Sequence, residues 1–349
     1  MPVLSELGQH PWLVAFTRRL SEWSTRESSM SFEPVKPHDE YMHPNTGEAN
    51  FNESMYFNFY DRTQKLGGFV RIGNRPNERY AEMTIAVYQP DGTALFNYQR
   101  PEIADNATFA AGGMAFTVLE PFQHLRVSYD GPAVYLAQPL DLADPKAAFT
   151  SNPFRPVTIE LDYRGLSPMY GGESSTFGHD AEMTFAKGHY EQHVRAAGSI
   201  TIDGQRTVLD GLGLRDHSWG PRSWQSPKYY RWLTCEFDDD FGFMGSQIAT
   251  QGGTELLSGF IFRDGENHFV HDLELHTEWK GTEQYHDRIT VTLHSATAGD
   301  LHVSGTVMTM LPLRNRRHGK VTRISEGMTE WRCGDAVGYG LSEYLDQMS

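Results

Sequence analysis

The sequence is poor in cysteine and has no long apolar run. Its 349 residues include only Cys235 and Cys333, too few for a disulfide framework, so we expect a reduced, cytoplasmic setting. The N-terminus lacks a cationic start followed by an apolar core, and we expect no secretory signal. No apolar run approaches the ~20 residues that a membrane span requires. We therefore expect no membrane insertion and infer that the protein itself encloses any apolar ligand.

Positive charge and nucleotide-binding motifs are also scarce. The formal net charge is −15, which disfavours binding to nucleic acid or to an anionic membrane. The short basic run at 314–317 is typical of a solvated turn. No G-x-S-x-G elbow occurs, which disfavours an α/β-hydrolase. No G-x-G-x-x-G follows a strand and opens a helix, so nicotinamide, flavin and ATP enzymes are disfavoured and we expect no cofactor.

Alternation of apolar and polar residues with a period of two dominates from about residue 50 onward. It is clear at 80–87, 289–293, 301–307 and 337–344, and together with 12% aromatic residues it predicts an all-β chain. We expect tight turns at Asp130-Gly131 and Asp203-Gly204. Helical spacing of Leu13, Phe16, Leu20 and Trp23 predicts one amphipathic helix over residues 10–27.

The stretch 165–188 has turn composition and suggests a boundary between two β domains. The expected organisation is an N-terminal helical segment (1–30), a first β domain (31–185) and a second β domain (186–349). The chain has enough strands for two barrels or sandwiches.

The segment Gly211-Leu-Gly-Leu-Arg-Asp-His-Ser-Trp-Gly-Pro-Arg-Ser-Trp224 concentrates the chemistry of the chain. Its glycines permit close backbone approach or positive φ. Asp216 and His217 form a pair able to move a proton near neutral pH. Trp219 and Trp224 offer aromatic faces that line an apolar pocket and stabilise a cation. The combination favours acid–base chemistry on an apolar substrate.

Arg215-Asp-His-Ser-Trp-Gly220, followed by Arg222 and Trp224, resembles the signature of the carotenoid 1,2-hydratase (hydroxyneurosporene synthase) and AttH-like superfamily. The segments 68–77, 326–331 and 338–343 are also similar to strands of that superfamily. The resemblance implies two tandem lipocalin-like β-barrel or sandwich domains with a ligand cavity in or between them. It also implies activities such as hydration of isoprenoid double bonds or pericyclic reactions on polyene chains.

Adding water to a trisubstituted alkene, or removing it from a tertiary alcohol, passes through a tertiary carbocation, so the enzyme must deliver a proton into an apolar space. A buried carboxylic acid with a raised pKa supplies it, and aromatic faces hold the cation. We expect Asp216 as the acid and His217 as the base or relay. The expected substrate-binding residues are Trp219, Trp224, Arg222, Tyr230, Trp232, Glu40 and Tyr41. The resemblance places the last two at the opening of the first domain.

Several alternatives remain open. Successive residues on a strand point to opposite faces, so Asp216 would share a face with Leu214 and Ser218, and His217 with Arg215 and Trp219. Asp216 instead pairs with Arg215 or Arg222 if its role is to pin the domains together. His38, Asp39, Glu40 and His43 resemble metal ligands, but Pro37 and Pro44 break any helix that would align them, and we expect no metal.

Two further groups of residues are candidates for the site, and two further functions are alternatives to the expected one. Tyr229-Tyr-Arg-Trp232 is typical of a core or domain interface, and Glu343 with Tyr344 offers a second carboxylate and phenol. The expected function is a cofactor-independent lyase or isomerase, namely a hydratase, dehydratase or cyclase, acting on an isoprenoid-like hydrophobic small molecule. A noncatalytic carrier of such a molecule and a pericyclase are the alternatives.

Overall fold

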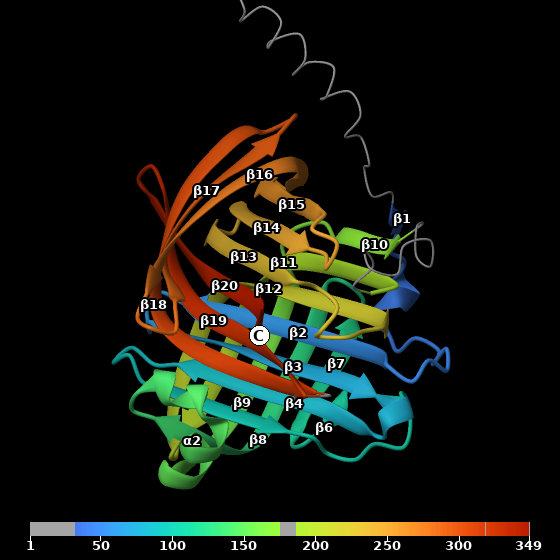
Figure 1. Ribbon diagram of the computed structural model, residues 1–349, viewed down its shortest axis with the longest axis vertical. Coiled ribbons are helices and arrows are strands. Elements are labelled where there is room, and N and C mark those ends of the chain that lie inside the picture. The colour runs from blue at the N-terminus through green and yellow to red at the C-terminus, as the bar shows by residue number, and fades with distance from the viewer. Residues whose placement is uncertain (1–31, 175–185, 318, 349) are drawn as a thin grey trace, which may run out of the picture.

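The computed structural model describes residues 32–174, 186–317 and 319–348, and these residues are mostly β-strand (Figure 1). The helix expected over residues 10–27 lies outside the described residues. Among the helices that the structure describes, none has the length and apolar character that a bilayer span requires.

The strands fall into two units, here called the first unit and the barrel. The first unit contains β1 (Phe32–Pro34), η1 (Pro37–Glu40), β2 (Phe51–Asp61), β3 (Leu66–Arg75), η2 (Pro76–Glu78), β4 (Tyr80–Tyr88), β5 (Ala94–Gln99), β6 (Ala110–Ala111), β7 (Met114–Glu120), β8 (His124–Leu136), η3 (Pro139–Ala143), α2 (Pro145–Ser151), β9 (Phe154–Gly165), β10 (Tyr170–Ser174), β11 (Gly188–Ile202) and β12 (Gln205–Pro221). The barrel contains β13 (Tyr229–Asp238), β14 (Phe241–Ala249), β15 (Glu255–Arg263), β16 (Glu266–Lys280), β17 (Tyr285–Ser295), β18 (Gly299–Arg317), β19 (Lys320–Cys333) and β20 (Ala336–Met348).

The first unit is a 12-stranded antiparallel sheet that closes around its own core. Strand β9 pairs with both β8 and β11, so the pairing runs from β12 through β2, β3, β4, β5, β8, β9 and β11 back to β12. Alternate residues of these strands point inward, among them Met55, Phe57, Ile72 and Ile85, and form the largest buried apolar cluster.

The second unit is a closed antiparallel barrel of eight strands, β13 to β20, in chain order. Its interior is filled by Phe243, Val291, Trp331 and Tyr344, among others. A third apolar cluster joins the units, because Tyr56 and Phe69 of the first unit pack with Leu311, Met328 and Leu341 of the barrel. Burial of each such side chain contributes roughly 1.5–3 kcal/mol to stability.

The expected all-β fold is therefore confirmed, whereas two local expectations need correction. The motif strand β12 was expected in a second domain beginning at residue 186. Both β11 and β12 instead pair within the first sheet, and sheet membership changes between Pro221 and Tyr229. Sequence spacing did not reveal this because β12 joins the sheet through β2 as well as β11, and its β2 partners lie about 160 residues earlier in the chain.

The two Asp-Gly pairs behave differently. Asp203 and Gly204 form the turn between β11 and β12, with φ of 50° and 77°. The turn expected at Asp130-Gly131 is wrong, since both residues lie within β8 and pair with β9. Gly131 makes room for the neighbouring ring of Tyr129, whose hydroxyl oxygen would lie 2.6 Å from an added Cβ.

Candidate functional site

A cavity of about 600 Å³ lies between the first unit and the barrel. Its walls come from the outward faces of β2–β5, β10–β12 and α2 on one side and of β13–β15 and β18–β20 on the other. The aromatic lining residues are Tyr56, Phe69, Phe96, Tyr98, Phe149, Tyr170, Trp224, Tyr230 and Trp232. The space is therefore large enough for a small organic molecule and offers it mainly apolar surface, to which these aromatic rings contribute.

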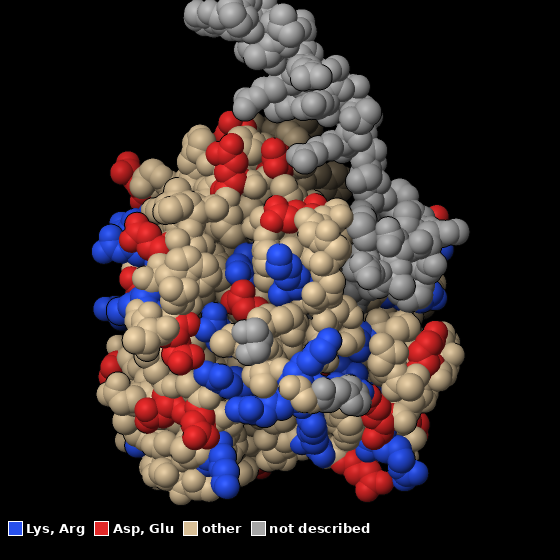
Figure 2. Space-filling model, viewed as in Figure 1, with Lys and Arg blue, Asp and Glu red and all other residues tan. Residues whose placement is uncertain are grey.

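Charged side chains of both signs also line this cavity. The basic ones are Arg71, Arg100, Lys146, Arg222 and Arg314. Arg100 and Lys146 are exposed, so cations stand where the cavity meets solvent. Figure 2 shows basic side chains gathered across the middle of the face in view, although the net charge of the protein is −15. A small molecule with an apolar body and a polar or anionic end fits such surroundings better than a pure hydrocarbon.

The motif residue Asp216 lines the cavity and pairs with His189 on the neighbouring strand β11. The Nε2 atom of His189 lies 2.6 Å from Oδ2 of Asp216 and 3.3 Å from Oε1 of Glu191. Burial lowers the pKa of His189, but the Asp216 charge outweighs it and raises that pKa to about 10. Burial likewise raises the pKa of Asp216, but the His189 charge reverses the effect and lowers it. An imidazolium and a carboxylate therefore face the cavity at neutral pH.

Two further carboxyl groups, Glu326 and Glu343, line the same cavity from the barrel. They are register partners on β19 and β20 and are 4% and 8% exposed. Burial raises the pKa of each to about 8, although the charge of Arg222 acts against this at Glu343 and that of Arg71 acts against it at both. Both groups carry a proton at neutral pH, which makes them proton donors in a largely apolar space.

The remaining contacts hold these groups in place. Trp232 donates from Nε1 to Oε1 of Glu191 at 3.0 Å, so one expected ligand-binding indole also fixes a carboxyl group. Arg222 donates from Nη1 to Oγ of Ser218 at 2.9 Å. The ion-pair partner of Asp216 is His189, and the charge of Arg222 adds a smaller effect that also lowers the pKa of Asp216. Arg215 pairs with Glu40.

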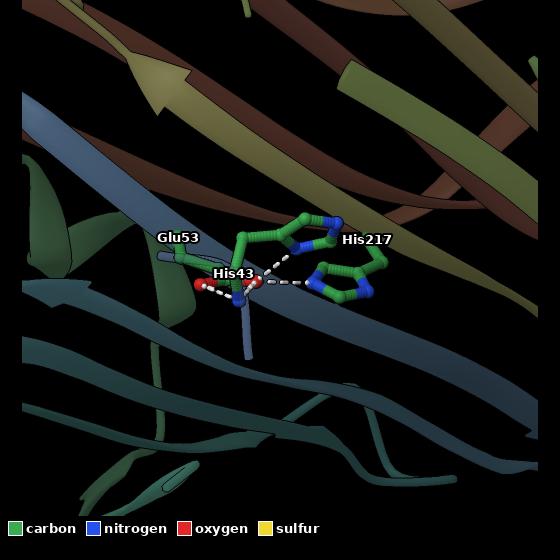
Figure 3. Close-up of side chains that lie close together, drawn as sticks. All are labelled: His43, Glu53 and His217. Carbon is green, nitrogen blue, oxygen red and sulfur yellow. Dashed lines mark hydrogen bonds and ion pairs between the residues drawn. The ribbon is translucent and has the colours of Figure 1, made fainter. Parts of the chain in front are cut away.

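His217 lies on the opposite face of β12 from Asp216, inside the first unit. Its Nε2 is 3.0 Å from Oε1 of Glu53, and its Nδ1 is 3.2 Å from the hydroxyl of Tyr190. His43 approaches the same Glu53 oxygen with Nδ1 at 2.7 Å (Figure 3). Burial raises the pKa of Glu53, but hydrogen bonds from His217 and His43 outweigh it and lower that pKa to about 2. The face assignments expected from strand alternation are therefore confirmed.

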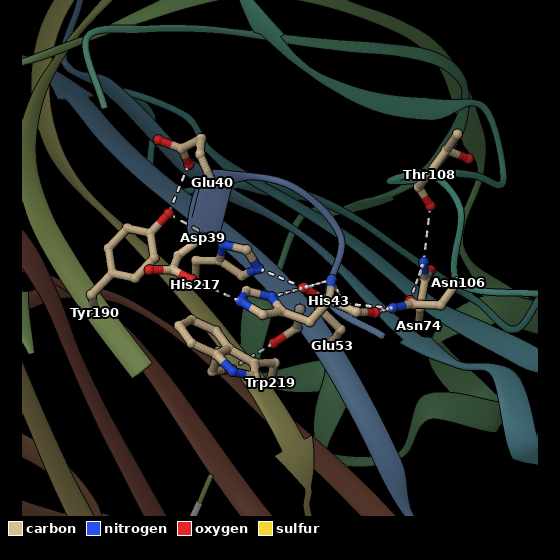
Figure 4. Close-up of polar contacts among 12 residues, drawn as sticks. Asp39, Glu40, His43, Glu53, Asn74, Asn106, Thr108, Tyr190, His217 and Trp219 are labelled. Atoms are coloured by element: carbon tan, nitrogen blue, oxygen red, sulfur yellow. Dashed lines mark hydrogen bonds and ion pairs between the residues drawn. The ribbon is translucent and has the colours of Figure 1, made fainter. Parts of the chain in front are cut away.

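Three residues expected to bind substrate belong elsewhere. Glu40 accepts hydrogen bonds from both terminal nitrogens of Arg215, at 2.7 and 2.9 Å, in a fully buried ion pair. Trp219 stacks on His43 with ring centroids 3.8 Å apart (Figure 4). Tyr41 is 50% exposed, and none of the three lines the cavity. In contrast, Arg222, Trp224, Tyr230 and Trp232 do line it.

The glycines of the motif act as expected. A Cβ at Gly213 would lie 2.0 Å from the carbonyl oxygen of Asn58, so this position lets β12 approach β2. Gly220 has a φ of +113°, which an L side chain rarely adopts.

Sequence reasoning named Glu343 but missed His189, Glu191 and Glu326 as cavity residues. Each lies on a strand with its side chain toward the cavity. The position of the cavity, however, depends on pairing between strands that are distant in the sequence. The local signal was a single acidic residue in an otherwise small or apolar stretch, as in Ser325-Glu-Gly-Met328. Tyr344 was expected to act together with Glu343, but its side chain packs in the core of the barrel and not in the cavity.

The chain belongs to a family described only as a domain of unknown function (DUF7064), whose model matches residues 36–348. No curated protein matches the sequence. Among solved structures, a Nitrosomonas europaea protein given the name AttH has 14% identity and a TM-score of 0.58, covering 90% of this chain and 96% of its own.

Two other solved structures have the same fold. CghA has 11% identity and a TM-score of 0.55, with 92% of this chain and 96% of that chain covered. Kievitone hydratase from Nectria haematococca has 12% identity and a TM-score of 0.54, with 90% and 96% covered. At these identities the likeness shows a shared AttH-like fold and leaves the reaction to be argued from the site.

Proposed function

We propose that the protein is a cofactor-independent lyase or isomerase that acts by acid–base catalysis on an isoprenoid-like hydrophobic molecule. The reaction is a hydration, dehydration or cyclisation, and it takes place in the cavity between the two units. One observation carries the proposal: two carboxyl groups with pKa values of about 8 share an aromatic-walled cavity with the His189–Asp216 ion pair.

Proton delivery is assigned to Glu343, with Glu326 beside it, rather than to Asp216. A carboxyl group with a pKa near the operating pH is an efficient proton donor, and it becomes an efficient acceptor once it has given the proton away. Protonation of an alkene, or of a tertiary alcohol followed by loss of water, leaves a carbocation. Trp224, Trp232 and Tyr56 line the cavity and contribute aromatic surface that stabilises a cation.

Asp216 takes the role of a fixed negative charge. As a carboxylate it stabilises positive charge on the substrate and holds the His189 imidazolium. The imidazolium in turn donates to a water or to the polar end of the substrate. His217, expected earlier as the base, has no part in this scheme because its side chain faces the interior of the first unit.

The fold relatives support the class of reaction but not its details. One of them is a hydratase by name, which is compatible with addition or removal of water in an AttH-like cavity. Both cysteines of the chain are free thiols, in keeping with the cytoplasmic location that we propose.

A carrier would need the cavity but not the protonated carboxyl groups. Burying two carboxyl groups costs stability, and a carrier gains nothing from that cost. We therefore favour an enzyme, with the carrier as the alternative outcome of the test.

The test begins with identification of the apolar compounds that co-purify with the protein, by mass spectrometry. Each compound is then incubated with the protein in ordinary and in ¹⁸O-labelled water. A product that gains or loses one water, or an isomer of equal mass, supports the proposal. Recovery of every compound unchanged supports the carrier, and full turnover by a protein carrying both Glu326→Gln and Glu343→Gln overturns the acid assignment.

A further inference from the structure

Three side chains from separate segments meet inside the first unit, away from the cavity. They are His43, from the segment between η1 and β2, Glu53 on β2 and His217 on β12, and their ligand atoms all lie within 4.8 Å of one another (Figure 3). The side chains of Glu53 and His217 are fully buried, and that of His43 is 13% exposed. We propose that these three residues bind one divalent transition-metal ion of the zinc type.

In each imidazole, one nitrogen faces Glu53 and is here called the inner nitrogen, and the other is called the outer nitrogen. Each outer nitrogen lies beside an oxygen that can accept a hydrogen bond. Nε2 of His43 lies 3.4 Å from Oδ1 of Asp39. Nδ1 of His217 lies 3.2 Å from the hydroxyl oxygen of Tyr190, which donates its own proton to Glu40 at 2.8 Å (Figure 4). Each outer nitrogen therefore has a neighbouring oxygen to which it can donate. Metal-binding histidines are oriented in this way, with the second nitrogen donating to a carboxylate or another acceptor.

The two inner nitrogens and the Glu53 carboxylate repel one another when no cation lies between them. When the outer nitrogens carry the hydrogen of each neutral ring, Nδ1 of His43 and Nε2 of His217 carry lone pairs, and both point at the same carboxylate oxygen, Oε1 of Glu53. Three electron-rich atoms converge in a buried space, where their repulsion is poorly screened. A dication placed between the three atoms would turn this repulsion into coordination. The dication also balances the charges of Glu53 and Asp39.

The donor set indicates which ion fits. Two imidazole nitrogens and one carboxylate oxygen suit Zn²⁺ and its neighbours, whereas Ca²⁺ and Mg²⁺ prefer oxygen ligands in larger number. A metal bound at about 2.0–2.2 Å would separate the ligand atoms by roughly 3.3 Å. The rings need to retreat by only a few tenths of an ångström from their present 2.7 and 3.0 Å.

The ion would tie the segment that follows η1 to β2 and β12. Trp219 already covers His43 with a nearly parallel ring, at an interplanar angle of 10°. His217 adjoins Asp216 in the chain, so the ion would also hold β12 firmly behind the cavity. The inference stands independently of the proposed enzyme activity.

The test uses the full chain, stripped with a chelator and then titrated with Zn²⁺ or Co²⁺ alone. We expect one ion per chain, the visible absorption of tetrahedral Co²⁺ with a nitrogen and oxygen ligand set, and a higher Tm in the presence of Zn²⁺. His43→Gln and His217→Gln should each lose the bound ion and the Tm shift. Tyr190→Phe, which keeps all three ligands but removes an acceptor, should weaken binding by about 10- to 100-fold.

Two control variants separate this site from others. His38→Gln changes an exposed histidine on η1 and should leave binding unchanged. His189→Gln removes the only histidine of the cavity cluster formed with Glu191 and Asp216, and it should also leave binding unchanged.

The proposal is overturned if the stripped wild type binds neither Zn²⁺ nor Co²⁺ and its Tm does not change when either ion is added. It is equally overturned if His189→Gln, rather than His217→Gln, removes the ion. If the His43 and His217 variants do not fold, undiminished affinity in Tyr190→Phe decides against the site.

Discussion

Asp216 and His217 are adjacent in the chain, yet their side chains serve two separate polar clusters on opposite sides of β12. Asp216 pairs with His189 at 2.6 Å at the cavity, and His217 pairs with Glu53 at 3.0 Å inside the first unit. A strand places consecutive residues on opposite faces, so one strand supplies both clusters. Substitutions at these two neighbours should therefore have different consequences.

Asp216→Asn should abolish turnover while leaving cooperative thermal unfolding intact. The change removes the negative charge that faces the substrate, but the asparagine retains the shape and an acceptor for His189. Circular dichroism during heating and an activity assay on the same preparation measure the two effects. Parallel loss of fold and activity would show that the ion pair is chiefly structural.

Glu343→Gln should lower kcat by about 10²- to 10⁴-fold with little change in KM, because it removes a proton donor and keeps the side-chain volume. In the wild type, the proton on Glu326 and Glu343 is lost as pH rises through about 8. The rate should therefore fall on the alkaline side of that value. A rate that does not change within roughly two pH units on either side of this pKa would contradict the acid role.

The same two carboxyl groups should make the protein less stable as pH rises. The folded state keeps their protons up to about pH 8, whereas the unfolded chain releases them near the ordinary value of 4.5. Between these values the folded state binds more protons, so the free energy of unfolding falls with increasing pH. Each pKa unit is worth about 1.4 kcal/mol, which gives a cost of several kcal/mol at most.

Glu326→Gln and Glu343→Gln should therefore raise Tm at pH 9 and have little effect at pH 5. A gain of about 2–4 °C is expected for each kcal/mol recovered. Glu274→Gln is a suitable control, because that side chain is 78% exposed and should leave the pH dependence of Tm unchanged. Equal Tm differences at both pH values would mean that neither group carries a raised pKa.

Strand alternation was sufficient to predict several elements and the two faces of β12. The segments at 80–87 and 337–344 became β4 and β20, and the expected partition of Arg215 and Trp219 from Leu214 and Ser218 is confirmed. These predictions depend only on the geometry of an extended chain, which local sequence determines.

Pairing between distant strands was beyond such reasoning. Glu326 becomes a cavity residue because β19 pairs with β20 and faces the first unit. A single acidic residue in a small and apolar stretch marks the position as unusual, but it does not tell which surface the side chain faces. The partner of Glu40 is Arg215, 175 residues away, so the interpretation of Glu40 as a ligand contact had no local check. Likewise, Pro37 and Pro44 argued against a metal site built from His38, Asp39, Glu40 and His43, whereas the candidate ligand cluster in the structure draws on three separate segments.

The Glu40–Arg215 pair provides the last prediction. Both side chains are fully buried, so removing one charge leaves the other without compensation in a medium of low dielectric. Glu40→Leu or Arg215→Met should each lower the free energy of unfolding by about 3–5 kcal/mol, measured by denaturant titration.

The double variant Glu40→Leu with Arg215→Met should recover much of that loss, because neither charge is then buried alone. Its cavity is unchanged, since neither residue lines it, and ligand binding should persist once the fold is restored. If the double variant is as unstable as the sum of the single variants, the two charges do not interact, and another contact must hold η1 against β12.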